Sequence, residues 1–158
     1  MELQGTHTAP GCRFAIVVSR FNEEVTEGLL AGAREALAQA AVRDEDVTIV
    51  RVPGAFELPV TASRLSESGQ FDAVICLGCL IKGDTVHFEY IASAASHGIM
   101  DASTTTGVPV AFGVLTALTE EQAAERSKPG DNNKGREAAL AAIEMATLFR
   151  TLDEGPTT

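Results

Sequence analysis

The sequence is poor in the features that mark secreted disulfide-bonded proteins, membrane proteins and nucleic-acid-binding proteins. Three cysteines in 158 residues do not make the even set of a disulfide framework. No apolar stretch approaches the length that crosses a bilayer, and the first residues lack the basic start and apolar run of a secretory signal. A net charge of −10, with no stripe of Lys or Arg, argues against nucleic-acid binding. We therefore expect a cytoplasmic protein that binds neither a membrane nor nucleic acid.

The residues that are present predict one globular domain. Hydrophobic residues make up 45% and charged residues 22%, which are ordinary values for a chain with a packed core. The two ends are rich in Gly, Pro and Thr, and no linker or repeat interrupts the region between them. We expect a flexible segment at 1–12, a single domain at 13–152 and a loose tail at 153–158.

The C-x-x-C spacing of Cys76 and Cys79 raises the question of a metal or redox site. The surrounding AVICLGCLI is typical of a buried strand, in which positions three apart point to opposite faces. No second Cys/His pair completes a set of four ligands. We therefore predict that both cysteines are core residues and that no metal is bound.

Short β-rich runs alternate with Ala-rich helical segments along the domain. The unbroken apolar run at 73–81 is typical of a strand buried on both faces of a parallel sheet. Predicted strands lie at 13–19, 47–52, 73–81 and 108–116, and predicted helices at 24–41, 57–67, 85–105, 119–127 and 133–151. Thr119 and Gln122 match a capping box at the fourth helix. This order predicts an α/β fold, a flavodoxin-like three-layer α/β/α sandwich with a parallel four-stranded sheet.

Ligands of such sheets bind beyond the carboxyl ends of the strands. His87 falls there, about one turn into the third predicted helix, and its imidazole suits proton transfer near neutral pH. A surface or core histidine is an equally good interpretation. Gly83-Asp84-Thr85 could hold a phosphate through backbone N–H groups, or Asp84 could simply cap the helix. His97, deeper in the same helix, is expected to be structural or exposed.

Four other residues at this edge also have two interpretations. Phe21 could stack on a flat heterocycle or pack in the core. Glu57 could accept hydrogen bonds from a polyol or complement a helix dipole. Arg126 and Lys134 flank a turn rich in Gly, Pro and Asn, where they could bind phosphate or be solvated. A receiver domain would end its third strand in a lone Asp, and a flavodoxin would follow its first strand with a Ser/Thr-rich loop; neither pattern is present.

Six blocks match one family in order and spacing: SRFN at 19–22, GAFELP at 54–59, GCLIKGDTVHFEYI at 78–91, PVAFGVLT at 109–116, EQAAER at 121–126 and NKG at 133–135. Over 13–150 the chain resembles the 6,7-dimethyl-8-ribityllumazine synthases. The resemblance implies a transferase of riboflavin biosynthesis that needs no cofactor. It would condense 5-amino-6-(D-ribitylamino)uracil with 3,4-dihydroxy-2-butanone 4-phosphate. It also implies a homopentamer of flavodoxin-like subunits, with active sites between adjacent subunits.

The resemblance assigns roles residue by residue. It implies that His87 is the catalytic proton shuttle. Pyrimidine and ribityl binding would fall to Phe21, Ala55, Phe56, Glu57, Cys79, Leu80, Ile81, Phe112 and Lys134. Phosphate binding would fall to Asp84, Thr85 and Arg126. In this scheme Phe112, Arg126 and Lys134 come from the adjacent subunit, and Lys134 reaches ribityl hydroxyls or phosphate.

One turn departs from the family pattern. Many capsid-forming members carry G-x-K-x-G before the NKG element, where this chain has Ser127-Lys128-Pro129-Gly130-Asp131-Asn132. Pro129 restricts the backbone there, so we expect a free pentamer and not an icosahedral shell. A non-catalytic lumazine- or flavin-binding relative, or a shell-forming one, is the alternative; the joint presence of His87, Arg126 and Lys134 favours an enzyme.

Overall fold

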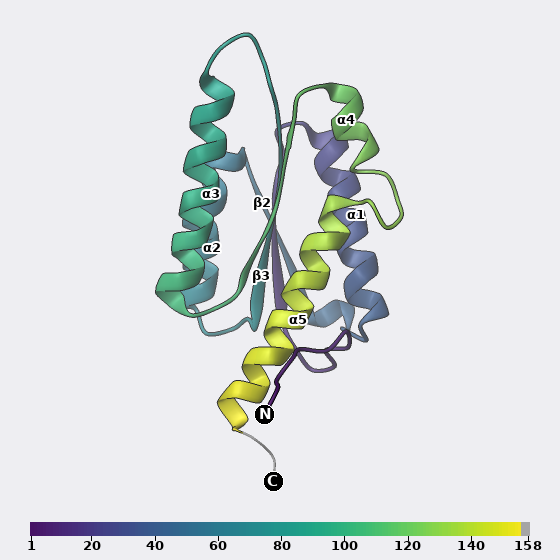
Figure 1. Cartoon of the computed structure of the whole chain (residues 1–158), viewed down its shortest axis with the longest axis vertical. Helices are drawn as coiled ribbons and strands as arrows, with labels where there is room; N and C mark the ends of the chain where they lie inside the picture. Colours follow the sequence, from purple (N-terminus) through teal and green to yellow (C-terminus); the bar gives the residue numbers. More distant parts are fainter. Residues whose placement is uncertain (156–158) are drawn as a thin grey trace.

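A four-stranded sheet forms the middle layer of the computed structural model, which describes residues 1–155 (Figure 1). The strands are β1 (Phe14–Ser19), β2 (Val47–Val52), β3 (Ala73–Ile81) and β4 (Val110–Ala117). All neighbours pair in parallel, in the order β2-β1-β3-β4. Every residue of β1 is buried, and so is all of β3 except Ile81, as the apolar run at 73–81 predicts. The predicted α/β class and the three-layer sandwich are confirmed.

Helices cover both faces of the sheet. The helices α1 (Glu23–Gln39), α4 (Glu120–Glu125) and α5 (Lys134–Glu154) lie on one side, and α2 (Leu58–Glu67) and α3 (His87–Thr106) lie on the other (Figure 1). Alternate residues of β1 and β3 feed two separate cores, because successive strand side chains point to opposite faces. None of the helices within residues 1–155 is both long and apolar enough to span a membrane.

Most element boundaries agree with the sequence pattern, and the differences have local causes. The helix expected at 57–67 begins with a 3₁₀ turn, η2 (Ala55–Glu57). The third helix begins at His87 and not near 85, so His87 lies at the first residue of α3 and not one turn inside it. At α4, Thr119 Oγ1 accepts from the backbone N–H of Gln122 at 3.1 Å, as the capping box predicts. The side chain of Gln122 reaches back to Leu118 N at 2.9 Å, one residue earlier than in the standard motif.

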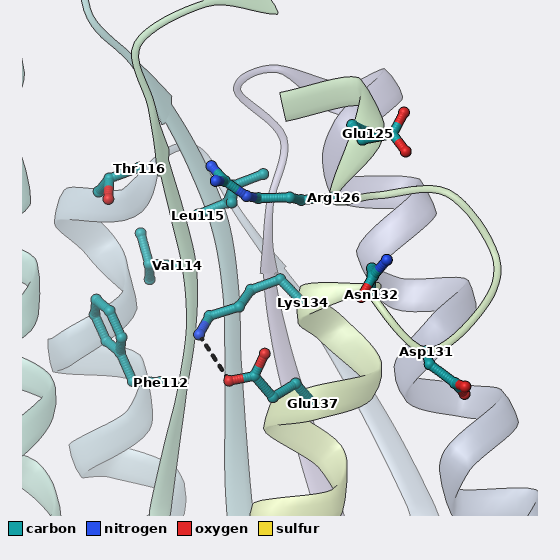
Figure 2. Close-up of a pocket in the computed structure, with 10 residues that line it drawn as sticks. All are labelled: Phe112, Val114, Leu115, Thr116, Glu125, Arg126, Asp131, Asn132, Lys134 and Glu137. Carbon is teal, nitrogen blue, oxygen red and sulfur yellow. Dashed lines mark hydrogen bonds and ion pairs between the residues drawn. The ribbon is translucent and has the colours of Figure 1, made fainter. Parts of the chain in front are cut away.

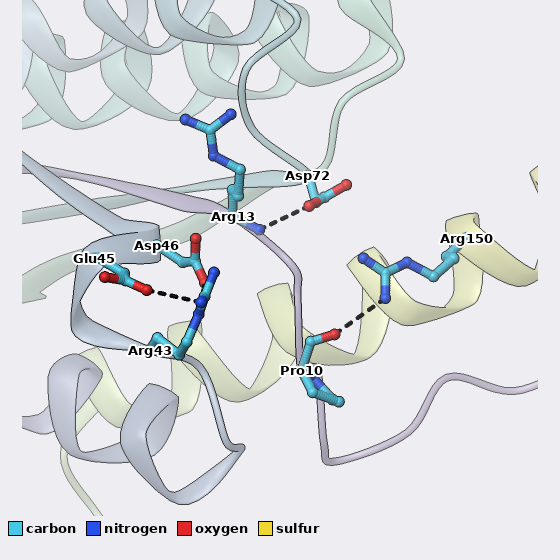
Figure 3. A network of polar contacts seen from close by, with 7 residues as sticks. All are labelled: Pro10, Arg13, Arg43, Glu45, Asp46, Asp72 and Arg150. Carbon is cyan, nitrogen blue, oxygen red and sulfur yellow. Dashed lines mark hydrogen bonds and ion pairs between the residues drawn. The ribbon is translucent and has the colours of Figure 1, made fainter.

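The two ends of the domain meet along α5. The segment 1–12, for which we expect flexibility, hydrogen bonds through Thr6 N to Thr147 Oγ1 at 2.8 Å and through Ala9 N to Ala40 O at 2.9 Å. Arg150 donates to Pro10 O at 3.3 Å (Figure 3). Helix α5 continues to Glu154, and the part of the expected tail from residue 156 onward lies outside the described residues.

Helices α1 and α5 approach each other so closely that glycine is required at the crossing. A Cβ added to Gly135 of α5 would overlap the backbone carbonyl of Leu29 in α1. Gly28 and Gly32 of α1 face the segment that leads into α5, where a Cβ would overlap Ser127 O and the amide of Asn133. A helix with two interior glycines loses roughly 1 kcal/mol at each relative to alanine, so the contacts that they permit must offset that loss.

The two cysteines of the C-x-x-C spacing belong to different cores, Cys76 to the α2–α3 side and Cys79 to the α1–α5 side, as the strand pattern predicts. All three cysteines are free and buried. Residues 1–155 contain no cluster of His, Cys, Asp and Glu that could hold a metal ion. Burial raises the pKa of the Cys76 thiol to about 12 and that of Cys79 to about 11. Burial also raises the pKa of Cys12, and the nearby Arg150 partly opposes this effect.

We predict that replacing Gly135 with alanine lowers the free energy of unfolding by roughly 1–3 kcal/mol, the usual cost of overpacking. Urea denaturation followed by far-UV circular dichroism measures the change. The matched control is Gly83→Ala, because no atom lies within 4 Å of the added Cβ there. Equal stability of the Gly135→Ala variant and wild type would contradict the close crossing of α1 and α5.

We predict that none of the three thiols reacts with a disulfide reagent in the native protein at about pH 8, because raised pKa values leave little thiolate and burial blocks access. All three should react once guanidinium unfolds the chain. Absorbance of the released thiol reports both states. Rapid reaction of one native thiol would show that its part of the chain is not packed as described.

Candidate functional site

The loop after β1 presents an aromatic ring to solvent. Backbone N–H groups of Arg20 and Phe21 donate to Val52 O at 2.9 Å and Pro53 O at 3.0 Å, which prolongs the pairing with the β2 chain. Asn22 then adopts a left-handed conformation with φ 60°, and its Nδ2 donates to Cys79 O at 3.0 Å. This turn leaves the side chain of Phe21 65% exposed. Of the two interpretations of Phe21, core packing is therefore wrong.

Asn22 helps to shape this site, and sequence reasoning did not single it out. Asparagine tolerates the left-handed region better than other non-glycine residues, and that preference is the signal that could have found it. Its amide ties the end of β1 to β3, so it fixes where the ring of Phe21 stands.

The turn after β2 holds Glu57 through one of its carboxylate oxygens. Gly54 N donates to Glu57 Oε1 at 3.0 Å, which makes a local cap for η2. Within residues 1–155, Oε2 has no hydrogen-bond partner and remains able to accept one. Next to it Phe56 is 61% exposed, while Ala55 is buried against the sheet. The turn therefore presents an apolar ring and an acceptor side by side.

The connection from β3 to α3 is exposed and carries the histidine. Residues 82–87 are all solvent-accessible, so the core interpretation of His87 is wrong. Val86 occupies the N-cap position of α3 and makes no side-chain cap. The cap that we considered for Asp84 is therefore not formed; the only local side-chain contact is a weak one, from His87 N to Thr85 Oγ1 at 3.4 Å.

These three segments surround one cavity of about 580 Å³, which we call the Phe21 pocket. It opens between η2 and the start of α3, at the carboxyl ends of β1, β2 and β3. Its lining includes the predicted site residues Phe21, Ala55, Phe56, Glu57, Leu80, Ile81, Thr85 and His87. Of the predicted residues that the resemblance does not assign to the adjacent subunit, two do not line it: the side chain of Cys79 is in the core, and Asp84 lies outside the lining.

A second cavity of about 530 Å³, the Arg126 pocket, lies between β4 and the α4–α5 connection. Arg126 stands at the end of α4 and Lys134 at the start of α5, and both side chains extend toward β4 (Figure 2). Phe112 of β4 also lines the pocket and is 40% exposed. The predicted residues Phe112, Arg126 and Lys134 thus share one cavity.

The lining of the Arg126 pocket combines two cations, Arg126 and Lys134, with three carboxylates. Two of these carboxylates have cationic partners outside the lining: Glu125 accepts from Lys128 Nζ at 2.7 Å, and Asp131 lies 3.9 Å from Arg136 Nε. The hydrogen bond from Lys128 lowers the pKa of Glu125. Arg126 has no carboxylate within 4 Å among residues 1–155, whereas Lys134 pairs with Glu137 at 3.2 Å. The guanidinium is therefore available to a ligand.

The Phe21 pocket and the Arg126 pocket have no lining residue in common. The first lies on the side of α2 and α3, and the second lies beside the open edge of β4. One chain therefore presents two partial sites: an aromatic one with an imidazole and a carboxylate, and a cationic one. A family model described as 6,7-dimethyl-8-ribityllumazine synthase matches residues 11–150 of the chain.

Proposed function

The chain belongs to the 6,7-dimethyl-8-ribityllumazine synthase family, and from this premise we propose that it catalyses the family's reaction. The family is one of transferases in riboflavin biosynthesis. The substrates that we propose are 5-amino-6-(D-ribitylamino)uracil and 3,4-dihydroxy-2-butanone 4-phosphate. The products are 6,7-dimethyl-8-ribityllumazine, inorganic phosphate and water.

The observation that supports this function best is the composition of the Phe21 pocket. The exposed ring of Phe21 offers a face on which a planar pyrimidine stacks. The free Oε2 of Glu57 accepts a hydrogen bond from a ribityl hydroxyl. His87 lines the same cavity, in which the pyrimidine would bind. A ring binder, a polyol acceptor and a proton carrier are three of the functions that this reaction asks of a protein.

A second copy of the chain would complete the site. Phosphate binding needs a cation, and the Phe21 pocket has none in its lining, whereas the Arg126 pocket opens at the unpaired edge of β4. We propose that Phe112, Arg126 and Lys134 of one subunit face the Phe21 pocket of the next in a homopentamer. Large apolar side chains exposed on α3 and near β4 support such contacts: Val86, Tyr90, Met100 and Leu118 are each more than 60% exposed.

The reaction then proceeds by condensation and elimination. The pyrimidine amine attacks the ketone carbon, and loss of water gives an imine. Loss of the phosphate as a leaving group follows, and a second condensation with the remaining carbonyl closes the ring. His87 carries protons to and from the reacting nitrogen and oxygen atoms. Arg126 stabilises the departing phosphate, and holding both substrates together provides the larger share of the rate.

Product formation tests the proposal directly. Purified protein is mixed with both substrates, and the fluorescence of the lumazine product is followed above the uncatalysed background. The chain has no Trp and one Tyr, so protein emission interferes little. Growth of the signal in proportion to protein supports the function. Binding of the pyrimidine without turnover would indicate a non-catalytic relative, and no binding would refute the proposal.

We predict that His87→Ala lowers kcat by about 10²-fold, the lower end of what proton transfer by a side chain contributes, because substrate proximity remains. Steady-state kinetics at saturating substrates measures the loss. His97→Ala is the matched control, since this histidine of α3 hydrogen bonds to Ser93 O at 2.9 Å and does not line the pocket. An unchanged kcat in His87→Ala would remove His87 from the mechanism.

We predict that Arg126→Ala raises the KM of the sugar phosphate by roughly 10- to 100-fold, as loss of a charged hydrogen bond implies, with a smaller effect on the pyrimidine. Initial rates with each substrate varied in turn give both constants. Arg136→Ala serves as control, because its guanidinium is bound to Gln39 Oε1 at 2.9 Å. Equal increases in both KM values would argue against a phosphate-specific role.

A further inference from the structure

We propose that Asn133 is a positioning residue that sets the place of Arg126 relative to Lys134 and thereby the affinity for the phosphate-bearing substrate. This inference rests on the proposed function. Asn133 lies at the N-cap of α5, directly before Lys134, and is 1% exposed. It does not line the Arg126 pocket, so it would act through the residues that do.

The side-chain amide of Asn133 joins three parts of the chain. Its Nδ2 lies 3.1 Å from Gly28 O in α1, 3.1 Å from Ser127 O and 3.0 Å from Lys128 O. Its Oδ1 accepts from Arg136 N at 3.0 Å and so caps α5. One buried side chain therefore ties Ser127 and Lys128, at the start of the α4–α5 connection, to α1 and to the first turn of α5.

The amide packs directly against the backbone of α1, where two glycines leave room for it. A Cβ on Gly32 would overlap the amide of Asn133, and a Cβ on Gly28 would overlap Ser127 O. Two glycines one helical turn apart destabilise α1 on their own. The contacts that require glycine at positions 28 and 32 are with Ser127 and Asn133, and not with the sheet.

The other contacts of the connection include ion pairs at the surface and a backbone bond: Lys128 Nζ pairs with Glu125 at 2.7 Å, Asp131 lies 3.9 Å from Arg136 Nε, and Asn133 N donates to Gly130 O at 3.2 Å. The amide of Asn133 is the buried side chain among them. Residues 128–132 are exposed, and Ala123 is the only buried residue of the six-residue helix α4.

The one direct link between the two cations is the backbone bond from Lys134 N to Arg126 O at 2.9 Å. That bond joins the residue directly after Asn133 to the residue directly before Ser127. The side-chain amide of Asn133, which binds Ser127 O and Lys128 O, therefore controls the geometry of the hydrogen bond between Lys134 N and Arg126 O.

Oδ1 and Nδ2 have different functions, and one substitution separates them. Serine at position 133 keeps an oxygen that caps a helix, since Ser and Asn are comparable N-caps. It removes the donors to Gly28, Ser127 and Lys128. If Asn133 only capped α5, the serine variant would behave like wild type in every measurement.

The test is the kinetics of Asn133→Ser, with each substrate varied in turn. We expect the KM of the sugar phosphate to rise at least about tenfold, because displacement of a binding group by around 1 Å has effects of up to 10². The KM of the pyrimidine should rise by a smaller factor, because Phe21 and Glu57 keep their own contacts while Lys134, which we also expect to reach the ribityl chain, is displaced. Wild-type constants, or equal increases for both substrates, would overturn the proposal.

Two further variants control for stability and for size. Ile143→Val removes a methylene from a fully buried side chain of α5 away from the connection and should lower the unfolding midpoint while leaving both KM values unchanged. Asn133→Asp keeps the size and the cap but turns a carboxylate toward three carbonyl oxygens. It should raise the KM of the sugar phosphate at least as much as Asn133→Ser does. If Asn133→Asp does not fold, the kinetics of Asn133→Ser alone test the proposal.

Inorganic phosphate separates this inference from the proposed function. Its binding to wild type, Arg126→Ala and Asn133→Ser is measured by titration calorimetry, which needs no turnover. Binding that is weakened by both variants, in a protein that makes no lumazine, would refute the function and keep the positioning role. If the protein makes lumazine but Asn133→Ser keeps wild-type KM values and phosphate affinity, the proposed function stands and the positioning role of Asn133 is refuted.

Discussion

The extra length of β3 is the constraint on which the site depends. Strand β1 pairs with β3 only as far as Leu77, so residues 78–81 continue beyond it with β4 as their sole partner. The space left beside them is filled by the loop at 19–22, and the amide of Asn22 satisfies Cys79 O there. A Cβ at Gly78 would lie 3.1 Å from Leu58 and 3.2 Å from Ser19, so the neighbouring segments pack directly against this strand. The Phe21 pocket forms where β3 extends beyond the end of β1. The loop after β1, the turn after β2 and the connection from β3 to α3 converge there.

The strands and layers were predictable because they follow from local pattern. The runs at 47–52 and 73–81 match β2 and β3 residue for residue, since β-branched and apolar residues end there at Pro, Gly or charged residues. The start of α3 was not predictable in the same way. Asp84 has the chemistry of an N-cap, but the chain bends at residues 83–86 and places Val86 in that position.

The site was only partly predictable, because its geometry depends on contacts between distant residues. The exposure of Phe21 follows from a hydrogen bond between Asn22 and Cys79, which are 57 positions apart. The role that we assign to Asn133 follows from a contact with Gly28, which is 105 positions away. No periodicity or spacing in the sequence reports such pairs. The division of the predicted residues between two cavities likewise follows from the position of β4 at the sheet edge.

The single tyrosine has a consequence for how the protein can be observed. Tyr90 lies on α3 with 71% of its surface exposed, and it belongs to the exposed side chains at which we propose that subunits meet. The chain has no tryptophan. The tyrosine band of the absorption spectrum and most of the fluorescence of the polypeptide therefore originate from one ring on that helix face, because phenylalanine absorbs at shorter wavelengths and emits weakly. The fluorescence of Tyr90 therefore reports on the surface at which we propose that subunits meet, without any chemical modification of the protein.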